Sequence, residues 1–231
     1  MCTNMIKNIK NIHKEQNKTF LNKIIEHNGK ACLKKISFKK KVSIDNLLEP
    51  GNLYYIKSGV IMRSFSDSDG HTKAVGLLSK DEILGFATLF GEVPIQWTTT
   101  VLQDTEILVI TNKLLLDNYK ESLTLLGLNF QYYISISYLY WQSAFSVGFE
   151  RINFTLINLA CCLGERVKEN SFRMPNYISH DLIASFSSVT RSYVTRHLSK
   201  LMKEQIISIK NNKICIIDMN KLVLKTPNYY I

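Results

Sequence analysis

The fold is decided by residues 178–217, which read ISHDLIASFSSVTRSYVTRHLSKLMKEQIISIKNNKICII. Ser179 and Thr190 each precede an apolar-periodic segment, where a side-chain oxygen can accept a hydrogen bond from an unpaired backbone N–H and start a helix. The sequence therefore predicts a short helix over 180–186 and a longer one over 191–204, joined by a turn of three residues.

The longer helix is predicted to be amphipathic. Val194, Leu198 and Leu201 recur at four- and three-residue spacing and form its inner face. The outer face is polar and basic and carries Arg191, Ser192, Thr195, Arg196 and either Ser199 or Lys200. An arginine can bond O6 and N7 of guanine together, and a helix in the major groove presents its N-terminal residues to the bases. We therefore expect this face, with the cap Thr190, to contact DNA.

A β-hairpin is predicted after the two helices. Residues 206–209 and 214–217 are β-forming runs that can pair across the polar residues 210–213. Lys210 and Lys213 then lie at a basic tip that is suited to phosphate contact.

The charge of the chain also favours a polyanionic partner. The 231 residues carry a net charge of +10, and residues 151–231 hold 12 Lys and Arg against five Asp and Glu. Such a regional excess is typical of a nucleic-acid-binding domain, although solvated surface lysines are the alternative. The hydrophobic share of 45% indicates a folded chain.

Residues 1–111 predict a compact β-domain with an N-terminal helical segment. Turn-forming residues at 50–52 and 67–70 are expected to form hairpin corners. The strand-like runs between and around these turns are 33–38, 53–56, 60–65, 73–78 and 106–110.

Residues 112–149 predict a long helix with apolar residues on much of its circumference. One stripe consists of Leu126, Phe130, Tyr133, Ser137, Tyr140, Ala144 and Val147, and the stripe beside it consists of Leu125, Leu128, Tyr132, Ile136 and Leu139. One side can cover the β-domain while the other meets a second subunit, and the alternative is a core helix inside a monomer. An amphipathic helix over 151–167 and a polar connector over 168–177 follow.

Two separate stretches of this chain resemble one known family. Residues 178–184 (ISHDLIA) and 189–198 (VTRSYVTRHL) look like the helix-turn-helix of the Crp/Fnr transcription regulators. Residues 49–60 (EPGNLYYIKSGV) are similar to the first hairpin of that family's effector-binding β-roll. The resemblance implies an α+β architecture with a β-roll over 1–111, a dimerisation helix region over 112–149 and a winged helix-turn-helix over 150–231.

The resemblance also implies roles for individual residues. The family positions that read bases fall on Arg191, Ser192 and Arg196, and because the middle one is commonly glutamate, we expect a target that differs from the usual family sequence. Ser188 stands where the turn between the helices often has glycine, so either a somewhat strained backbone or an altered turn is expected there. The implied partners are double-stranded DNA, RNA polymerase and a second copy of the chain.

The effector of this chain is not expected to be cAMP. Members that bind cyclic nucleotides use an acid and an arginine in the stretch corresponding to residues 84–97, where this chain has Phe86 and no arginine. A buried phosphate would have no charged partner there. An apolar effector pocket is predicted from Phe86, Trp97, Tyr132, Ile136 and Ser137. These residues can equally be β-roll core, and effector-free DNA binding stays open.

The remaining residue patterns favour neither a cofactor nor an enzyme. The five cysteines, Cys2, Cys32, Cys161, Cys162 and Cys215, show no C-x-x-C spacing, so neither an iron–sulfur cluster nor a zinc site is expected. No P-loop, G-x-S-x-G or H-E-x-x-H motif occurs, and the histidines are scattered, with His180 and His197 predicted on the DNA-binding face. No membrane span or signal peptide is indicated, which predicts a cytoplasmic protein.

The leading hypothesis is a dimeric, sequence-specific transcription regulator that does not depend on cAMP. The alternative is a ligand-sensing module whose helical tail makes protein contacts. Arg191 and Arg196 on one exposed helix face favour the first.

Overall fold

The computed structural model describes residues 2–66, 68–69, 72–91, 97–211 and 213–226, without the side chains of residues 2–7 and 138–144. The chain forms two compact units. One comprises Asn11–Tyr133 and is called the β unit. The other comprises Ile134–Ile231 together with Met1–Lys10 and is called the C-terminal unit.

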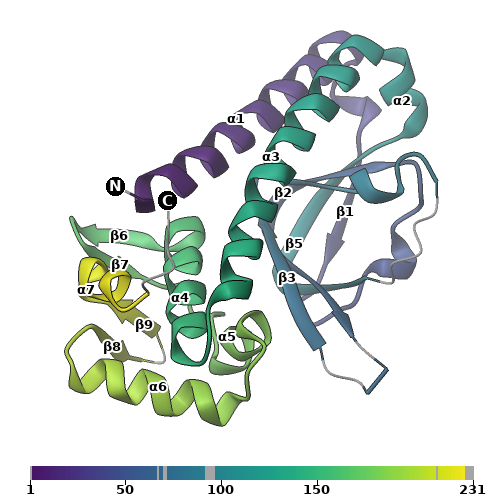
Figure 1. Ribbon diagram of the computed structural model, residues 1–231. Coiled ribbons are helices and arrows are strands. Elements are labelled where there is room, and N and C mark those ends of the chain that lie inside the picture. The colour runs from purple at the N-terminus through teal and green to yellow at the C-terminus, as the bar shows by residue number, and fades with distance from the viewer. Residues whose placement is uncertain (1, 67, 70–71, 92–96, 212, 227–231) are drawn as a thin grey trace. The chain divides into compact units, whose positions relative to one another are not determined.

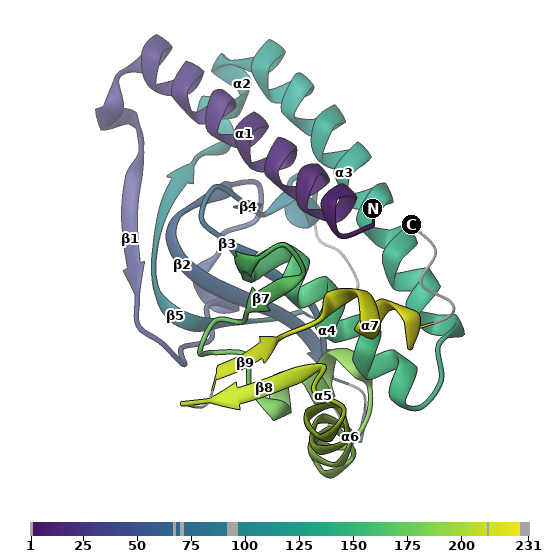
Figure 2. The same cartoon turned by 90° about the vertical axis from the view of Figure 1, so that its left-hand side faces the viewer.

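The β unit contains one antiparallel sheet that curls around its own core (Figures 1 and 2). The strands lie in the order β1-β5-β2-β3, and the short β4 pairs with β2. Their bounds are β1 Lys34–Phe38, β2 Leu53–Ser66, β3 Thr72–Ser79, β4 Ile83–Leu84 and β5 Thr98–Ile110. The β-domain expected from the sequence is therefore present.

The two predicted runs 53–56 and 60–65 are one continuous strand, β2. Its register against β5 shifts between Ile56 and Ile61. Gly59 lies in this bulge with a φ of 95°, and a Cβ there would stand 2.6 Å from the carbonyl oxygen of Asp104. The apolar pattern is interrupted because the strand bends here, not because it ends.

One of the two predicted hairpin corners is wrong. Residues 50–52 form a turn before β2, but β1 does not pair with β2, since both strands pair with β5. The second corner is confirmed, because β2 and β3 pair as far as Ser66 opposite Thr72. Within that corner, residues 67 and 70 lie outside the described part of the chain.

Two apolar clusters stabilise the β unit. The first lies inside the curled sheet and includes Tyr54, Ile56, Ile61 and Ile107. The second lies between the sheet and three helices, α1 Cys2–Asn28, α2 Asn112–Asp117 and α3 Tyr119–Phe145. Its buried side chains are Phe20, Leu21, Ile24, Leu53, Tyr55, Ile83, Ile110, Leu114, Leu115 and Leu125. Each large apolar side chain so buried contributes about 1.5–3 kcal/mol.

The single long helix predicted from residue 112 is two helices. They are separated at Asn118, whose φ of −120° and ψ of 45° are not helical. The side-chain amide of Asn118 donates to the carbonyl oxygen of Leu114 and its oxygen accepts from Asn28 of α1. This side chain therefore caps the end of α2 and joins it to α1 by a hydrogen bond.

Within the described residues, the C-terminal unit contains four whole helices and a four-stranded sheet, together with the start of α1 and the end of α3 (Figure 1). The helices are α4 Phe149–Leu163, α5 His180–Ser187, α6 Arg191–Lys203 and α7 Met219–Leu224. The strands are β6 Glu165–Lys168, β7 Ser171–Arg173, β8 Ile207–Lys210 and β9 Lys213–Ile216, in the order β6-β7-β9-β8.

The predicted helix over 151–167 ends earlier than expected, at Leu163. A Cβ on Gly164 would lie 2.5 Å from the carbonyl oxygen of Ala160, so only glycine allows the chain to turn away this tightly. The predicted polar connector over 168–177 in fact contains the last residue of β6 and the whole of β7. All four residues of β6 are exposed, and the strand therefore lacks the apolar alternation that would have revealed it.

Candidate DNA-binding surface

The helix–turn–helix of residues 179–203 is set up by local hydrogen bonds. The Ser179 hydroxyl accepts from the backbone N–H of Leu182 at 3.1 Å, and the Thr190 hydroxyl accepts from that of Tyr193 at 3.3 Å. Ser188 closes the turn with a φ of 52° and a ψ of 47°, a left-handed conformation. Both predicted caps are confirmed, and Ser188 keeps the left-handed conformation of a glycine turn, which favours a strained backbone over an altered turn.

Burial of the inner face of α6 fixes the direction of its outer face. Val194, Leu198 and Leu201 are fully buried. On the opposite side, all the predicted DNA contacts of this helix and its cap are exposed, namely Thr190, Arg191, Ser192, Thr195, Arg196 and Lys200. The structure therefore brings these six residues together on one surface, the outer face of α6.

Arg191 has an acidic neighbour on the preceding helix. Its Nε lies 3.6 Å from Oδ1 of Asp181, and both side chains are about two-thirds exposed, at 69% and 67%. An exposed pair of this kind is worth little, because water screens both charges. DNA can therefore displace Asp181 from Arg191 at little cost.

Arg196 lies over two stacked rings. The rings of Tyr193 and Phe149 are stacked, with centroids 4.6 Å apart, and the guanidinium carbon of Arg196 lies 5.0 Å and 5.9 Å from their centroids. Lys200 places its ammonium 5.9 Å from the centroid of Phe149. Sequence reasoning missed Phe149 because it lies on α4, far from α6 along the chain, and no local signal links the two.

His197 does not lie on the DNA-binding face, contrary to the prediction. Its side chain is only 4% exposed, stacks on Phe149 and shares a 2.7 Å hydrogen bond with Oδ1 of Asn153. The reason is helical spacing, since position 197 is three residues after Val194 and so belongs to the inner face. Burial, together with the positive charge of Lys200, lowers the pKa of His197 to about 4.

His180 is half-buried and shares a 2.9 Å hydrogen bond with the Thr195 hydroxyl. Thr195 also donates to the carbonyl oxygen of Arg191. This bond links the start of α5 to the outer face of α6 and orients a predicted DNA contact.

The predicted basic hairpin tip is present. Lys210 lies opposite Lys213 at the end of the β8–β9 pair, and both side chains are exposed. Asn211 adopts a φ of 50° in the turn, while residue 212 lies outside the described residues.

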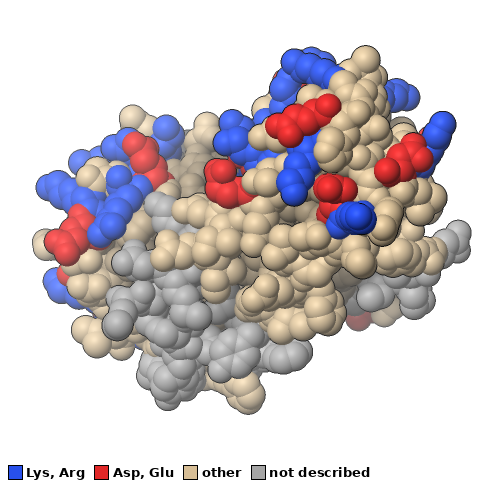
Figure 3. Space-filling view, turned by 90° about the horizontal axis from the view of Figure 1, so that it is seen from above, with Lys and Arg blue, Asp and Glu red and all other residues tan. Residues whose placement is uncertain are grey.

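Basic residues of both units form ion pairs, but four of the predicted DNA contacts form none among the described residues. In the β unit, Lys57 lies 2.6 Å from Glu106, and Lys39 lies 3.0 Å from Asp104. The face seen in Figure 3 likewise shows Lys and Arg close to Asp and Glu. By contrast, Arg196, Lys200, Lys210 and Lys213 form no ion pair with any residue that the structure describes. Their charge is available to a polyanion.

The aromatic residues predicted for an effector pocket make ring contacts with several neighbours in the described part of the chain. Phe86 and Tyr132 each contact Tyr133 edge to face, and Tyr132 also stacks on His13 at 3.7 Å. Trp97 instead pairs with Phe65 and with the guanidinium of Arg63. Ile136 and Ser137 are half-buried on the part of α3 that belongs to the C-terminal unit.

Arg63 changes the electrostatics that the sequence predicts for this region. The stretch 84–97 indeed supplies no arginine of its own, but the sheet brings Arg63 of β2 within 4.4 Å of the Trp97 ring. The expectation that no cation lies near this stretch is therefore wrong. Sequence alone does not show the pairing of these two positions.

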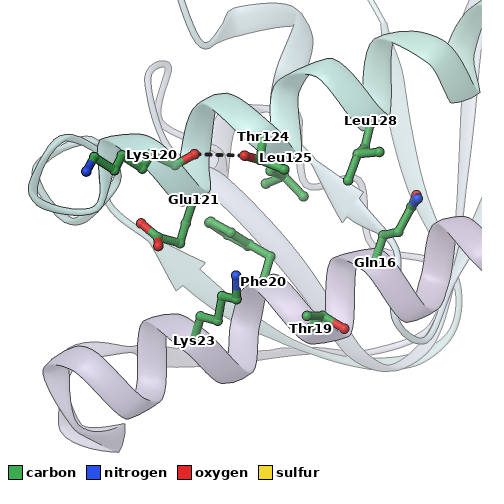
Figure 4. Close-up of a pocket in the computed structure, with 9 residues that line it drawn as sticks. All are labelled: Gln16, Thr19, Phe20, Lys23, Lys120, Glu121, Thr124, Leu125 and Leu128. Carbon is green, nitrogen blue, oxygen red and sulfur yellow. Dashed lines mark hydrogen bonds between the residues drawn. The ribbon is translucent and has the colours of Figure 1, made fainter.

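A separate shallow cavity of about 150 Å³ lies between α1 and α3 in the β unit (Figure 4). Its walls include Phe20, Leu125 and Leu128, with Lys23 and Glu121 at its edge. None of the predicted effector-pocket residues lines this cavity.

Neither a metal centre nor a membrane span emerges from the part of the chain that the structure describes. No group of three His, Cys, Asp or Glu residues could hold a metal ion there. No helix within the same residues is long and apolar enough to cross a bilayer. Cys32 and Cys215 are free thiols.

Comparison with known families identifies two domains. Residues 38–122 match the cyclic nucleotide-binding domain, and residues 150–224 match the Crp-like helix-turn-helix domain. A search of curated proteins finds no match.

Solved structures of low sequence identity share the fold. A cyclic nucleotide-binding domain containing protein from Listeria monocytogenes EGD-e is 18% identical, with a TM-score of 0.71 over 89% of this chain and 99% of its own. The CRP-family regulator TTHB099 from Thermus thermophilus is 18% identical (TM-score 0.69, 83% and 96% covered). FixK2 from Bradyrhizobium japonicum is 16% identical (TM-score 0.67, 83% and 96% covered).

Proposed function

Because the chain belongs to the Crp/Fnr family of transcription regulators, we propose that it binds DNA through the outer face of α6 and the tip of β8–β9. The observation that carries this proposal is the geometry of α6, whose inner face is fully buried while Arg191 and Arg196 lie exposed near its start. The family match favours DNA binding over a tail that makes only protein contacts.

Each group on this surface has a role that its chemistry supports. Arg191, Ser192 and Arg196 reach the base edges as α6 enters the major groove. Thr190, Thr195 and Lys200 contact the flanking phosphates, and Lys210 and Lys213 contact the backbone beside the groove. Arg191 exchanges Asp181 for a guanine as it binds.

Two copies of the chain are required to read two half-sites, since the recognition helices must lie about 34 Å apart. We assign the dimer contact to α3, which lies in the region 112–149. We propose that residues 1–111 form an effector-binding-like domain and that residues 150–231 form the DNA-binding domain. Phe130 is 69% exposed and Tyr133 39%, as a dimer face requires, whereas Leu126 is half-buried. Leu123, one heptad before Phe130, is 67% exposed and extends this surface. The predicted Tyr140 and Ala144 side chains lie outside the described residues.

We further propose that cAMP is not required, since Phe86 provides no acceptor for a ribose hydroxyl. A regulator of this kind acts in the cytoplasm, where it recruits or blocks RNA polymerase, and needs no catalytic function.

Selection of bound duplexes from a random pool by the purified protein tests the proposal. We expect enrichment of a two-fold symmetric sequence with half-site centres about 10 base pairs apart and guanines in each half. Recovery of random duplexes without a shared sequence would contradict it.

A further inference from the structure

Phe149, the first residue of α4, lies against one face of α6. Its ring stacks on that of Tyr193, with centroids 4.6 Å apart, and on that of His197, at 4.4 Å. The guanidinium carbon of Arg196 and the ammonium of Lys200 each lie 5.9 Å from its centroid. These four residues of α6 follow the i, i+3, i+4, i+7 spacing of one helix face, so a single ring of α4 contacts two turns of α6.

The position of this ring is fixed by buried hydrogen bonds of α4. Asn153, one helical turn after Phe149, shares a 2.7 Å hydrogen bond with Nε2 of His197, and both side chains are buried. Thr155 accepts a 2.8 Å hydrogen bond from the hydroxyl of Ser187 on α5. Because α4 is bonded in this way to both α5 and α6, a shift of the ring away from α6 would leave buried polar groups unpaired.

Tyr193 completes an aromatic surface beside Arg196. The planes of the Tyr193 and Phe149 rings differ by 21°, and the guanidinium carbon of Arg196 lies 5.0 Å from the centroid of the Tyr193 ring. Gly148 leaves room for Tyr193, since a Cβ on Gly148 would lie 3.1 Å from the tyrosine hydroxyl oxygen. The face of an aromatic ring is negative, and it attracts a cation within about 6 Å of its centroid. The two rings therefore restrict where the guanidinium of Arg196 lies.

Arg191 and Arg196 are held by different kinds of contact. Arg191 lies 3.6 Å from the carboxylate of Asp181, whereas Arg196 has ring contacts and no ion pair with any described residue. Burial, together with the charge of Lys200, lowers the pKa of His197 to about 4, so the third ring of the stack is neutral at pH 7. A guanidinium that stacks on a ring keeps its in-plane N–H donors available to O6 and N7 of a guanine.

We propose that Phe149 is a positioning residue for sequence recognition, and that its ring, with that of Tyr193, holds the guanidinium of Arg196 so that its N–H donors face a guanine. Phe149 acts through Arg196 and contacts no base itself. This role rests on the proposed DNA-binding function and deepens it, because the reading of one guanine then depends on a helix outside the helix–turn–helix. The ring contacts themselves are present without DNA.

Nuclear magnetic resonance of the full chain without DNA tests the ring contact. The currents of two nearby rings should shift the Nε–H proton signal of Arg196 upfield of that of Arg191, which has a carboxylate neighbour. Phe149→Leu keeps an apolar side chain of similar size but removes one ring. We expect the Arg196 signal to move downfield in this variant while the Arg191 signal, the internal control, stays in place.

Titration of DNA that carries 7-deazaguanine tests the role in recognition. This base lacks N7 and offers only O6 to an arginine, so the unaltered chain should prefer guanine at the position read by Arg196 by about tenfold. Arg196→Ala should abolish the preference, which identifies that position. Phe149→Leu should reduce it to about threefold or less, while Phe149→Tyr, which keeps a ring, should retain it. Random DNA should bind Phe149→Leu within about twofold of the unaltered chain, because its phosphate contacts remain.

Denaturant unfolding separates positioning from packing, since it reports whether each variant is folded under the conditions of the titration. A residue needed only for packing would weaken the selected sequence and random DNA by the same factor when it is replaced. If Phe149→Leu does not fold, Tyr193→Leu serves the same comparison, because it removes the nearer ring from a half-buried position.

The proposal is overturned if the folded leucine variant distinguishes guanine from 7-deazaguanine as well as the unaltered chain does, or if the Arg196 signal is the same in both. A preference for guanine that persists in this variant leaves the proposed DNA-binding function intact. If the unaltered chain prefers no sequence at all, the proposed function fails and the role of Phe149 in recognition fails with it, whereas the resonance measurement still decides the ring contact.

Discussion

Arg196 lies over the rings of Tyr193 and Phe149 before any DNA is bound. Ordering a flexible side chain on binding costs about 0.5–1.5 kcal/mol of conformational entropy. A guanidinium that already lies on a ring surface has lost part of its conformational freedom before binding, so this cost is smaller. The stacked rings therefore partly order the side chain of Arg196, which we expect to contact guanine, before DNA binds.

Arg196→Ala should reduce the preference for specific over random DNA by about 1–3 kcal/mol, because a bidentate base contact is lost. Lys213→Ala serves as the comparison. It should weaken both kinds of DNA alike and reduce the slope of log affinity against log salt by about one phosphate contact. Titrations at several salt concentrations measure both quantities, and equal losses from the two variants would remove the recognition role from α6.

His197 gives the stability of the C-terminal unit a dependence on pH. Its pKa is lowered to about 4 in the folded chain, against an ordinary value of about 6.5, so the unfolded chain binds more protons between these values. The contribution of neutral His197 is complete above about pH 6.5 and is lost as the pH falls toward 4. We expect a loss of about 1–3 kcal/mol, after allowance for solvent screening.

Denaturant unfolding at pH 7, 5.5 and 4 measures this loss. His197→Leu should be less stable at pH 7, because Asn153 loses its partner, but should show a smaller fall with pH. An equally steep fall in the variant would mean that other groups cause it.

At the scale of helices and strands, the elements that depend on local interactions could be predicted from the sequence, whereas the pairing of distant strands could not. The caps at Ser179 and Thr190 and the stripe on α6 act within a few residues, so the sequence predicted α5, α6 and the basic hairpin closely. The pairing of β1 with β5 and the approach of Arg63 to Trp97 depend on strands far apart in sequence. The periodicity of apolar residues does not show which residues of distant strands lie side by side.

The exposed apolar residues of α3 are expected to form the dimer interface. Phe130→Glu or Leu123→Glu should give monomers in sedimentation, because a charge in an apolar interface loses its hydration without a partner. Leu116, on α2, is 68% exposed, and Leu116→Glu is the matched control that should remain dimeric. Charged substitutions at Tyr140 or Ala144 should act as Phe130→Glu does. Persistence of the dimer in all four α3 variants would exclude this helix as the interface.

At the scale of the whole molecule, the two matched domains pair a sensing fold with a DNA-binding fold. Gly85 lies within the matched cyclic nucleotide-binding domain, and its φ of 103° and the 2.3 Å approach of a Cβ to the carbonyl oxygen of Asn52 require glycine. The backbone here follows a turn that only glycine allows, while the side chain that follows it is Phe86.

Calorimetry with cAMP, followed by DNA titration in its presence, should show neither tight binding nor enhanced affinity for the selected sequence. Micromolar or tighter binding with enhanced DNA affinity would contradict this, and would mean that Arg63 can serve as the partner of a cyclic phosphate.

The exposed apolar side chains of Leu123 and Phe130 should also make the stability of the folded chain depend on the protein concentration. If a second copy covers them, association withdraws folded monomer from the unfolding equilibrium by mass action. The melting temperature should therefore rise with total protein concentration, and Phe130→Glu should abolish that rise while leaving the dilute-limit value nearly unchanged. A cell that makes little of this regulator would then hold a larger fraction of it as separate chains, unable to span two half-sites, so that its occupancy on DNA would vary more steeply than its abundance.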